Sequence, residues 1–203
     1  MTGERTGAIT IAPLGPAYLD GFARLFEAAS SACFCRYWHF TGNKNEWLER
    51  CAFRPEENMA EQSAAVASDD PSGRGLVAIL EGAVPVVIGW MKLAPREAVP
   101  KLTRLPVYRG LTAEDGTWTI GCFQIHPEHR RRGVARRLVE AADDFVLGWG
   151  GRVIEAHPRR STEPLHDEEA WQGPEGVFVG HGYAAFHDVP PYPVYRKVLT
   201  PKT

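Results

Sequence analysis

The chain has 203 residues, of which 44% are hydrophobic and 24% are charged, close to the values of ordinary globular proteins. Its 23 Lys and Arg against 25 Asp and Glu give a formal charge of −2, which argues against a generally basic nucleic-acid binder and an acidic disordered chain. No apolar run approaches the roughly 20 residues that a membrane-spanning helix needs, so we expect no membrane segment. This length predicts one domain whose core needs no metal or disulfide.

The N-terminal third predicts a strand followed by helices. Residues 8–11 form a short apolar strand, and residues 18–29 carry apolar side chains at helical spacing. An aromatic stretch with two cysteines follows at residues 33–40, before a charged helix over residues 55–67. The first seven residues lead into no apolar signal-peptide core, so we expect a cytoplasmic protein whose four cysteines are thiols.

The rest of the chain predicts most of a sheet. Two strands, residues 76–80 and 84–93, flank a tight turn at Glu81-Gly82 and form a hairpin. Residues 94–116 are rich in proline and are predicted to be a long irregular loop. The remaining predicted elements are a strand at 118–125, the clearest helix at 134–149, and strands at 153–156, 183–189 and 194–199. This order predicts a mixed α/β sheet in one domain.

The turn between the strand at 118–125 and the helix at 134–149 carries the chemistry. Pro127 ends the strand, and Gly133 permits a positive φ. The first amides of the helix have no intrahelical acceptor and converge with the positive end of its dipole, so they form a seat for an anion. Five arginines in residues 130–137 add charge, and each charge-assisted hydrogen bond to a phosphate contributes about 1.5–3 kcal/mol. The turn therefore predicts a pyrophosphate site; a solvated basic helix start and a nucleic-acid patch are the alternatives.

This segment resembles a known motif. Arg130-Arg131-Arg132-Gly133-Val134-Ala135, after Ile125-His126-Pro127, resembles the Gln/Arg-x-x-Gly-x-Gly/Ala pyrophosphate loop of the GNAT family of acyl-CoA-dependent N-acyltransferases. Residues 153–156, 177–183 and 196–199 resemble the family's fifth strand, its late Phe-Tyr-x-x-x-Gly-Phe segment and its final strand. Residues 89–92 and 95–97, together with residues 155–158 and the Cys-x-Cys-x-Tyr-Trp stretch, resemble a bacterial subgroup without an agreed substrate.

The resemblance implies a single GNAT-type domain over residues 1–203. Its fold would be α/β (α+β), with a mixed, mostly antiparallel sheet of six or seven strands flanked by about four helices. Residues 7–75 would supply the N-terminal strand and the acceptor-side helices, and residues 76–200 the acetyl-CoA-binding core. The implied co-substrate is acetyl-CoA, and the implied acceptor is an amine of a small molecule or peptide. No metal is expected, nor a nucleic-acid or membrane partner, and a homodimer is compatible with the family.

The resemblance also implies cofactor contacts. Backbone groups of Phe123 and Ile125 would pair with the pantetheine arm, and the amides of residues 131–135 would hold the pyrophosphate. The amide of Ile125 or Phe123 would face the acetyl carbonyl as an oxyanion donor. The predicted cofactor-binding residues are Phe123, Gln124, Ile125, Arg130, Arg131, Arg132, Gly133, Val134, Ala135, Arg136 and Phe178.

The sequence gives less evidence for the catalytic residues than for the cofactor-binding residues. An amine with a pKa near 10.4 is only about 0.1% free base at neutral pH, so a base is needed. The strand at 118–125 lacks the carboxylate that many family members carry, so we consider Glu155 first and His157 second, against structural roles for both. Phe178 stands where the family frequently has a Tyr general acid. We expect direct attack on the thioester and interpret Cys122 as a buried thiol rather than an acyl carrier.

The aromatic stretch at residues 33–40 predicts the acceptor side. Phe34, Tyr37, Trp38 and Phe40 would form an aromatic wall, and Arg36 would pair with an acidic group of the acceptor; a plain core patch is the alternative.

Cys33, Cys35, His39 and Cys51 could ligate zinc, but their spacing departs from the usual pattern. Two other functions therefore remain open beside the acetyltransferase: a non-catalytic acyl-CoA-binding module and a zinc-bearing interaction protein.

Overall fold

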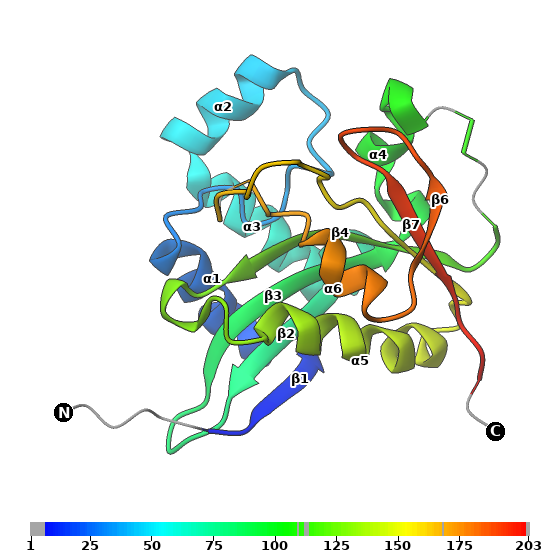
Figure 1. Cartoon of the computed structure of the whole chain (residues 1–203). Helices are drawn as coiled ribbons and strands as arrows, with labels where there is room; N and C mark the ends of the chain where they lie inside the picture. The colour runs from blue at the N-terminus through cyan, green and yellow to red at the C-terminus, as the bar shows by residue number, and fades with distance from the viewer. Residues whose placement is uncertain (1–6, 109, 112–113, 168, 202–203) are drawn as a thin grey trace.

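The computed structural model describes residues 7–108, 110–111, 114–167 and 169–201. Residues 1–6, which carry most of the segment considered for a signal peptide, lie outside this set. The centre of the molecule is a seven-stranded sheet with the order β1-β2-β3-β4-β5-β7-β6 (Figure 1). The strands are β1 (Ile9–Pro13), β2 (Gly75–Leu80), β3 (Val86–Pro95), β4 (Thr117–Ile125), β5 (Val153–Ala156), β6 (Ala184–His187) and β7 (Val194–Val198). Only β4 and β5 pair in parallel, which confirms the predicted mixed, mostly antiparallel fold.

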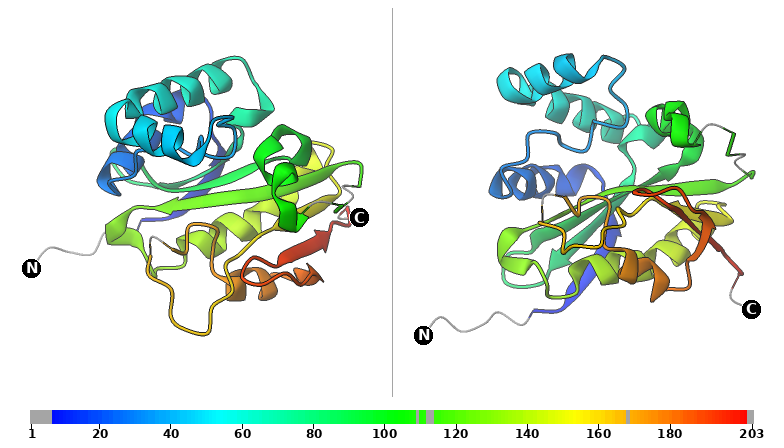
Figure 2. Two further views of the ribbon diagram at one scale, coloured as in Figure 1. Left: turned by 90° about the horizontal axis from the view of Figure 1, so that it is seen from above. Right: turned by 45° about the horizontal axis from the view of Figure 1, so that its top comes forward.

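Helices cover both faces of this sheet. The described residues contain α1 (Leu19–Ala28), α2 (Lys44–Phe53), α3 (Pro55–Ala67), α4 (Pro100–Arg104), α5 (Val134–Gly148) and α6 (Glu175–Val179). Four of these have ten or more residues, and α4 and α6 have five each. The group α1–α3 lies on one side of the sheet and α5 on the other (Figure 2). None of the helices in the described residues is long and apolar enough to span a bilayer.

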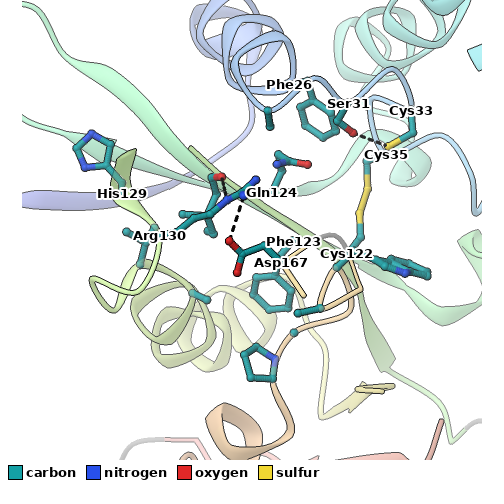
Figure 3. Close-up of a pocket in the computed structure, with 18 of the residues that line it drawn as sticks. Phe26, Ser31, Cys33, Cys35, Cys122, Phe123, Gln124, His129, Arg130 and Asp167 are labelled. Atoms are coloured by element: carbon teal, nitrogen blue, oxygen red, sulfur yellow. Dashed lines mark hydrogen bonds and ion pairs between the residues drawn. A yellow bond between two sulfur atoms is a disulfide. The ribbon is translucent and has the colours of Figure 1, made fainter. Parts of the chain in front are cut away.

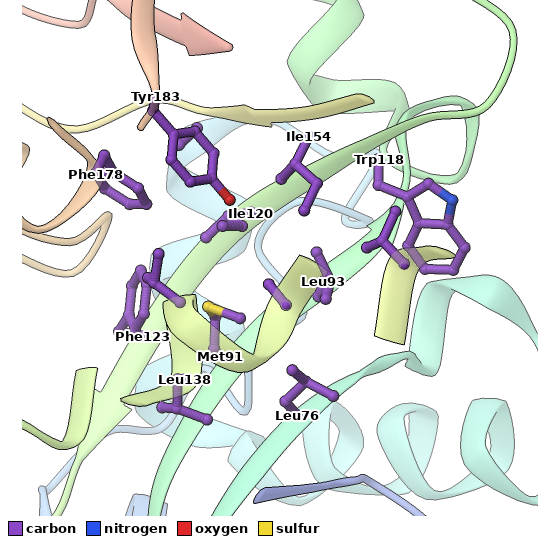
Figure 4. Close-up of a cluster of buried hydrophobic side chains, with 14 of the residues drawn as sticks. Leu76, Met91, Leu93, Trp118, Ile120, Phe123, Leu138, Ile154, Phe178 and Tyr183 are labelled. Carbon is purple, nitrogen blue, oxygen red and sulfur yellow. The ribbon is translucent and has the colours of Figure 1, made fainter. Parts of the chain in front are cut away.

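Two apolar cores result from the alternation of side chains along the central strands. On β3, Met91 and Leu93 face α5 and pack with Leu138 and Ile154 (Figure 4). Trp90, the residue before Met91, faces α1 and packs edge-on against Phe22, with 5.0 Å between ring centroids. Successive residues of a strand point to opposite faces, so one run of apolar residues fills both cores.

The centre of the sheet opens between β4 and β5. Their parallel pairing runs from the pair Thr117 and Val153 to the pair Ile120 and Ala156. One extra residue on β4, between Ile120 and Phe123, forms a bulge against β3 at this level. Beyond it β4 continues to Ile125, while β5 has ended at Ala156. One edge of β4 is therefore left without a neighbouring strand where the two strands part.

Candidate active site

A cavity of about 660 Å³ lies at this opening (Figure 3). The volume falls in the range of ordinary small-molecule and cofactor sites. Its walls come from the end of β4, the turn into α5, the segment after α1, and the loop between β5 and α6. Segments far apart in the sequence therefore meet at the parting of β4 and β5.

The turn into α5 has the backbone of an anion-binding site. Arg131 and Gly133 both have left-handed backbones, with φ of 58° and 79°, and α5 begins at Val134. Successive amides around such residues form a concave nest, and the first amides of a helix have no intrahelical acceptor. A Cβ added at Gly133 would have no atom within 4 Å, so open space lies in front of this residue. An anion can therefore approach the backbone here.

Arginine side chains border the same turn. Arg130 donates from Nε to the carbonyl of Ile125 at 3.3 Å, and its Nη1 lies 3.2 Å from Asp167. Arg131 lies 3.5 Å from the same carboxylate. Of the predicted loop residues, the cavity is lined by Arg130, Arg131, Gly133, Val134, Ala135 and Arg136. Arg132, predicted with them, is exposed and lies outside the lining.

The free edge of β4 supplies backbone groups to the cavity. Gln124 is paired with Trp90 of β3, and the amide of His126 donates to Ile88 at 2.9 Å. Because the direction of backbone hydrogen bonding alternates along a strand, the backbone N–H and C=O groups of Phe123 and Ile125 point away from β3 and toward the opening. The amide of Phe123 donates to the carbonyl of Trp171 at 2.6 Å. The predicted residues Phe123, Gln124 and Ile125 therefore all line the cavity.

Aromatic rings form the wall opposite the turn. Tyr37 packs edge-on against Trp38 and Trp47, with centroid distances of 5.5 and 5.6 Å. Trp171 closes this cluster, 5.6 Å from the ring of Trp38. Tyr37 and Trp38 were predicted as acceptor contacts, and both line the cavity.

Three more residues predicted on the acceptor side, Phe34, Arg36 and Phe40, do not line the cavity. Phe34 is buried against Phe26, with ring centroids 5.3 Å apart. Arg36 is buried and donates to Gln62 and to the carbonyl of Ser72. Burial lowers the pKa of its guanidinium. The geometry therefore offers Arg36 no direct access to an acceptor in the cavity.

The cysteines differ from the sequence-based expectation. Cys35 forms a disulfide with Cys122 of β4, and both residues line the cavity. The prediction of four thiols, and of Cys122 as a buried thiol, is therefore wrong for this pair; Cys33 and Cys51 are free. The reason is the fold, which lays the segment after α1 directly on the bulge of β4. The described residues hold no group of three or more His, Cys, Asp or Glu that could bind a metal, and the disulfide removes Cys35 from the proposed zinc set.

Glu155 lies outside the cavity, in a buried ion-pair network. It is fully buried and lies 2.6 Å from Arg196 and 3.3 Å from Arg96. It is absent from the cavity lining, and two guanidinium groups already occupy its carboxylate. Glu155 lies next to the last pair of β4 and β5, as expected, but its buried carboxylate has no direct access to an acceptor in the cavity.

His157 is placed in a similar way. Its Nε2 lies 3.2 Å from the hydroxyl of Thr119, and its ring packs on Tyr108 with centroids 4.9 Å apart. Burial, aided by Arg96, lowers the pKa of His157 to about 3, so the imidazole is neutral at ordinary pH. Like Glu155, it lies outside the lining of the cavity. Neither residue is therefore placed to act as a base toward an acceptor in the cavity.

Phe178 also lies apart from the cavity surface. It is fully buried in the core, where it packs edge-on against Phe123 at 6.2 Å and Tyr183 at 5.5 Å. Its neighbour Val177 lines the cavity instead. Phe178 therefore packs against Phe123 of β4 within the core and does not face the cavity.

Some lining residues had little or no signal in the sequence. Trp47 comes from α2, a helix that the periodicity does not predict, although Asn43 and Glu46 form a capping box that marks its start. Ser31 and Asp167 lie in irregular segments, where no periodic pattern indicates which side chains face the cavity.

The comparison with known proteins identifies the class. Residues 34–168, more than half of the chain, match the family model of the acetyltransferase (GNAT) family. The chain therefore belongs to the GNAT family of acetyltransferases, and the resemblance seen in the sequence is confirmed. No curated protein matches the chain.

Solved structures of low sequence identity share the fold. PaiA N-acetyltransferase from Thermoplasma acidophilum, in complex with coenzyme A, is 11% identical with a TM-score of 0.55, over 94% of this chain and 99% of that one. YncA from Salmonella typhimurium, with its cofactor acetyl-CoA, is 15% identical with a TM-score of 0.54, over 95% of each chain. A GNAT-family acetyltransferase from Listeria monocytogenes is 10% identical with a TM-score of 0.54, over 94% of this chain and 95% of that one. At these identities the likeness shows the fold alone.

Proposed function

We propose that the protein transfers the acetyl group of acetyl-CoA to a primary amine of a small molecule or peptide, by direct attack in a ternary complex. One observation carries this proposal: the free edge of β4 runs straight into the turn before α5, and both open onto the same cavity. A long thioester with a diphosphate at its other end needs such a combination of an extended edge and an anion seat.

The residues present fit this cofactor. The amides of residues 131–135 would hold the diphosphate at the N-terminus of α5, and Arg130, Arg131 and Arg136 would add charge. Phe123 and Ile125 would pair their backbone groups with the amides of the pantetheine arm, as a strand pairs with its neighbour. Acetyl-CoA, when bound, supplies the activated acyl group as a thioester.

The reaction needs few groups of the chain itself. The amine nitrogen attacks the carbonyl carbon, a C–N bond forms, and the C–S bond breaks. The amide of Phe123 or Ile125 would donate to the carbonyl oxygen while negative charge develops on it. The sulfur leaves as a thiolate and takes up a proton, so the products are the N-acetylated acceptor and free CoA.

The amine must also lose a proton before it can attack the thioester. An amine with a pKa near 10.4 carries a penalty of about 4 kcal/mol for deprotonation at neutral pH. Among the described lining residues the one carboxylate is Asp167, which is already paired with Arg130 and Arg131. We therefore assign the proton to water in the cavity.

The aromatic wall of Tyr37, Trp38 and Trp47 would hold the apolar part of the acceptor.

Steady-state release of the CoA thiol tests the proposal. The protein is incubated with acetyl-CoA and a panel of amines, including an arylamine, a polyamine, free lysine and a peptide with a free N-terminus. We expect thiol release above the rate of acetyl-CoA hydrolysis with at least one amine, together with saturable binding of acetyl-CoA by calorimetry. Binding without turnover would favour the non-catalytic acyl-CoA-binding module. A lack of binding together with one equivalent of zinc would favour the interaction protein.

A further inference from the structure

The loop between β5 and α6, residues 157–174, turns back into the opening of the sheet. Within it, the amide of Ala170 donates to the carbonyl of His166 at 3.2 Å, and that of Gly173 donates to Ala170 at 2.8 Å. Gly173 has a φ of 88°, and a Cβ there would lie 2.7 Å from the ring of Phe123. Only a residue without a side chain lets the loop approach β4 this closely. We name Asp167 and residues 169–173 the latch segment.

The latch segment occupies the backbone donor at one end of the cavity. The carbonyl of Trp171 accepts from the amide of Phe123 at 2.6 Å. The ring of Trp171 holds this carbonyl in place, packed 6.2 Å from Tyr37 and 5.6 Å from Trp38. The amide of Phe123 is one of the two that would face the acetyl carbonyl of the cofactor. A carbonyl of the chain therefore stands where a carbonyl of the ligand would bind.

The same segment also reaches the arginine side chains that border the anion seat. The carboxylate of Asp167 lies 3.2 Å from Arg130 (Figure 3) and 3.5 Å from Arg131. These arginines border the turn whose amides would hold the diphosphate. A carboxylate of the chain therefore pairs with two arginines that an anionic group of the ligand would use.

We propose that the latch segment is an internal competitor of acetyl-CoA, in which Asp167 replaces the diphosphate and the carbonyl of Trp171 replaces the thioester carbonyl. This inference rests on the proposed function, since it takes the cofactor to lie along Phe123 and the turn before α5. The two contacts are made by different groups of the latch segment, at Phe123 and at Arg130 and Arg131, and all of these residues line one cavity. Binding of the cofactor then requires release of the latch segment, and the apparent affinity is reduced by the fraction of molecules in which it is closed.

The contacts are of a kind that a ligand can displace. The side chain of Asp167 is 42% exposed and that of Arg131 is 83% exposed, so solvent screens their attraction. The diphosphate carries more charge than one carboxylate and would also meet the amides of the turn, so it binds this seat more strongly than Asp167 does.

Calorimetric titration of three variants with two ligands tests the proposal. Asp167→Asn removes the competitor at the anion seat, and Trp171→Ala removes the rings that hold the competing carbonyl. Asp69→Asn makes the same change of charge at the exposed pair with Arg74 and serves as the matched control. The ligands are CoA, which has both ends, and ADP, which has the diphosphate without the pantetheine arm.

The expected pattern separates the two ends. Asp167→Asn should lower the Kd of both CoA and ADP by about two- to fivefold. Trp171→Ala should lower the Kd of CoA and leave that of ADP unchanged, and Asp69→Asn should change neither. Unchanged or weaker CoA binding by Asp167→Asn would overturn the latch, because Asp167 would then be orienting the arginines for the ligand.

Hydrogen exchange gives a second readout that does not depend on the variants. Binding of CoA to the wild-type protein should speed amide exchange in residues 169–173 while it slows exchange in residues 131–135. Slower exchange in both segments would show that the loop closes over the ligand, and would overturn the latch while the proposed function stands. If neither the wild type nor any variant binds CoA, the proposed function itself is rejected, and the latch with it.

Discussion

Gly133 decides whether the turn before α5 can receive a phosphate. Its φ of 79° lies in the left-handed region that most side chains avoid at a penalty of about 1–2 kcal/mol. The residue caps α5 without a side-chain hydrogen bond, and the space around its missing Cβ is open. The conformation, rather than crowding by the protein, therefore restricts this position.

Replacement of Gly133 by glutamate should abolish acetyl-CoA binding while the protein remains folded. The carboxylate would point into the open space of the anion seat, where it repels the diphosphate. We expect the Kd to rise at least about a hundredfold, as measured by calorimetry. Gly133→Asn is the matched control, because asparagine tolerates the left-handed conformation and adds no charge; its Kd should stay within a few-fold of the wild type. If the glutamate variant binds acetyl-CoA as tightly as the wild type, the turn is not the diphosphate site.

At the scale of elements, the segment after α1 is joined to β4 by a covalent link. Phe34 and Cys35 have left-handed backbones, with φ of 41° and 60°, and the disulfide from Cys35 to Cys122 closes a separation of 87 residues. The aromatic wall that begins at Tyr37 is thereby attached to the bulge of β4.

Reduction of this disulfide should destabilise the protein. In the chain-entropy model a loop of this length contributes about 4–5 kcal/mol. We expect dithiothreitol to lower the melting temperature of the wild type, and to leave that of the double variant Cys35→Ser/Cys122→Ser unchanged. The single variant Cys51→Ser should respond to dithiothreitol as the wild type does. Thiol titration of the denatured, unreduced protein should find two thiols, Cys33 and Cys51; four thiols would contradict the disulfide.

The elements show why part of this molecule can be predicted from its sequence. The helices α1 and α5 and all seven strands have local apolar patterns, and α3 is a charged helical segment. Each of these elements lies within a few residues of its predicted range. The interval 94–116 was predicted as an irregular loop, but it holds α4 and two short 3-10 turns. Its prolines mislead because Pro100 and Pro106 stand at the starts of helical turns, where a missing amide does no harm.

The candidate site divides in the same way. The turn before α5 and the end of β4 are contiguous in sequence and carry a local motif, so their lining residues could be predicted. Contacts such as that of Asp167 with Arg130, or of Cys35 with Cys122, depend on which segments the fold brings together. No periodicity or spacing in a single sequence encodes those pairs, and the burial of Arg36, Glu155 and His157 away from the cavity depends on the same kind of long-range contact.

At the scale of the whole molecule, buried ion pairs connect the two halves of the sheet. Arg96 follows β3, Glu155 lies on β5 and Arg196 lies on β7. Glu155 contacts both arginines, and Arg196 also reaches the exposed Glu114 at 2.7 Å. The network therefore joins both sides of the place where β4 and β5 part.

Replacement of Glu155 by glutamine should lower the stability of the protein and leave the rate of acetyl transfer nearly unchanged. Loss of the negative charge leaves two buried guanidinium groups without their counter-ion, and breaking a buried pair in this way costs about 3–5 kcal/mol. For a chain of this size that corresponds to a fall in melting temperature of about 6–20 °C.

Glu114→Gln is the matched control for this variant, because it removes an exposed partner of Arg196 and should lower the melting temperature by only a few degrees. The thiol-release rate per folded molecule should be close to that of the wild type in both variants, measured well below the melting temperature of Glu155→Gln. A rate that falls at least about tenfold in Glu155→Gln, with little change in its melting temperature, would reverse this assignment. It would mean that the carboxylate reaches the amine despite its two arginines, and that the sheet opens further in solution than the ion pairs allow.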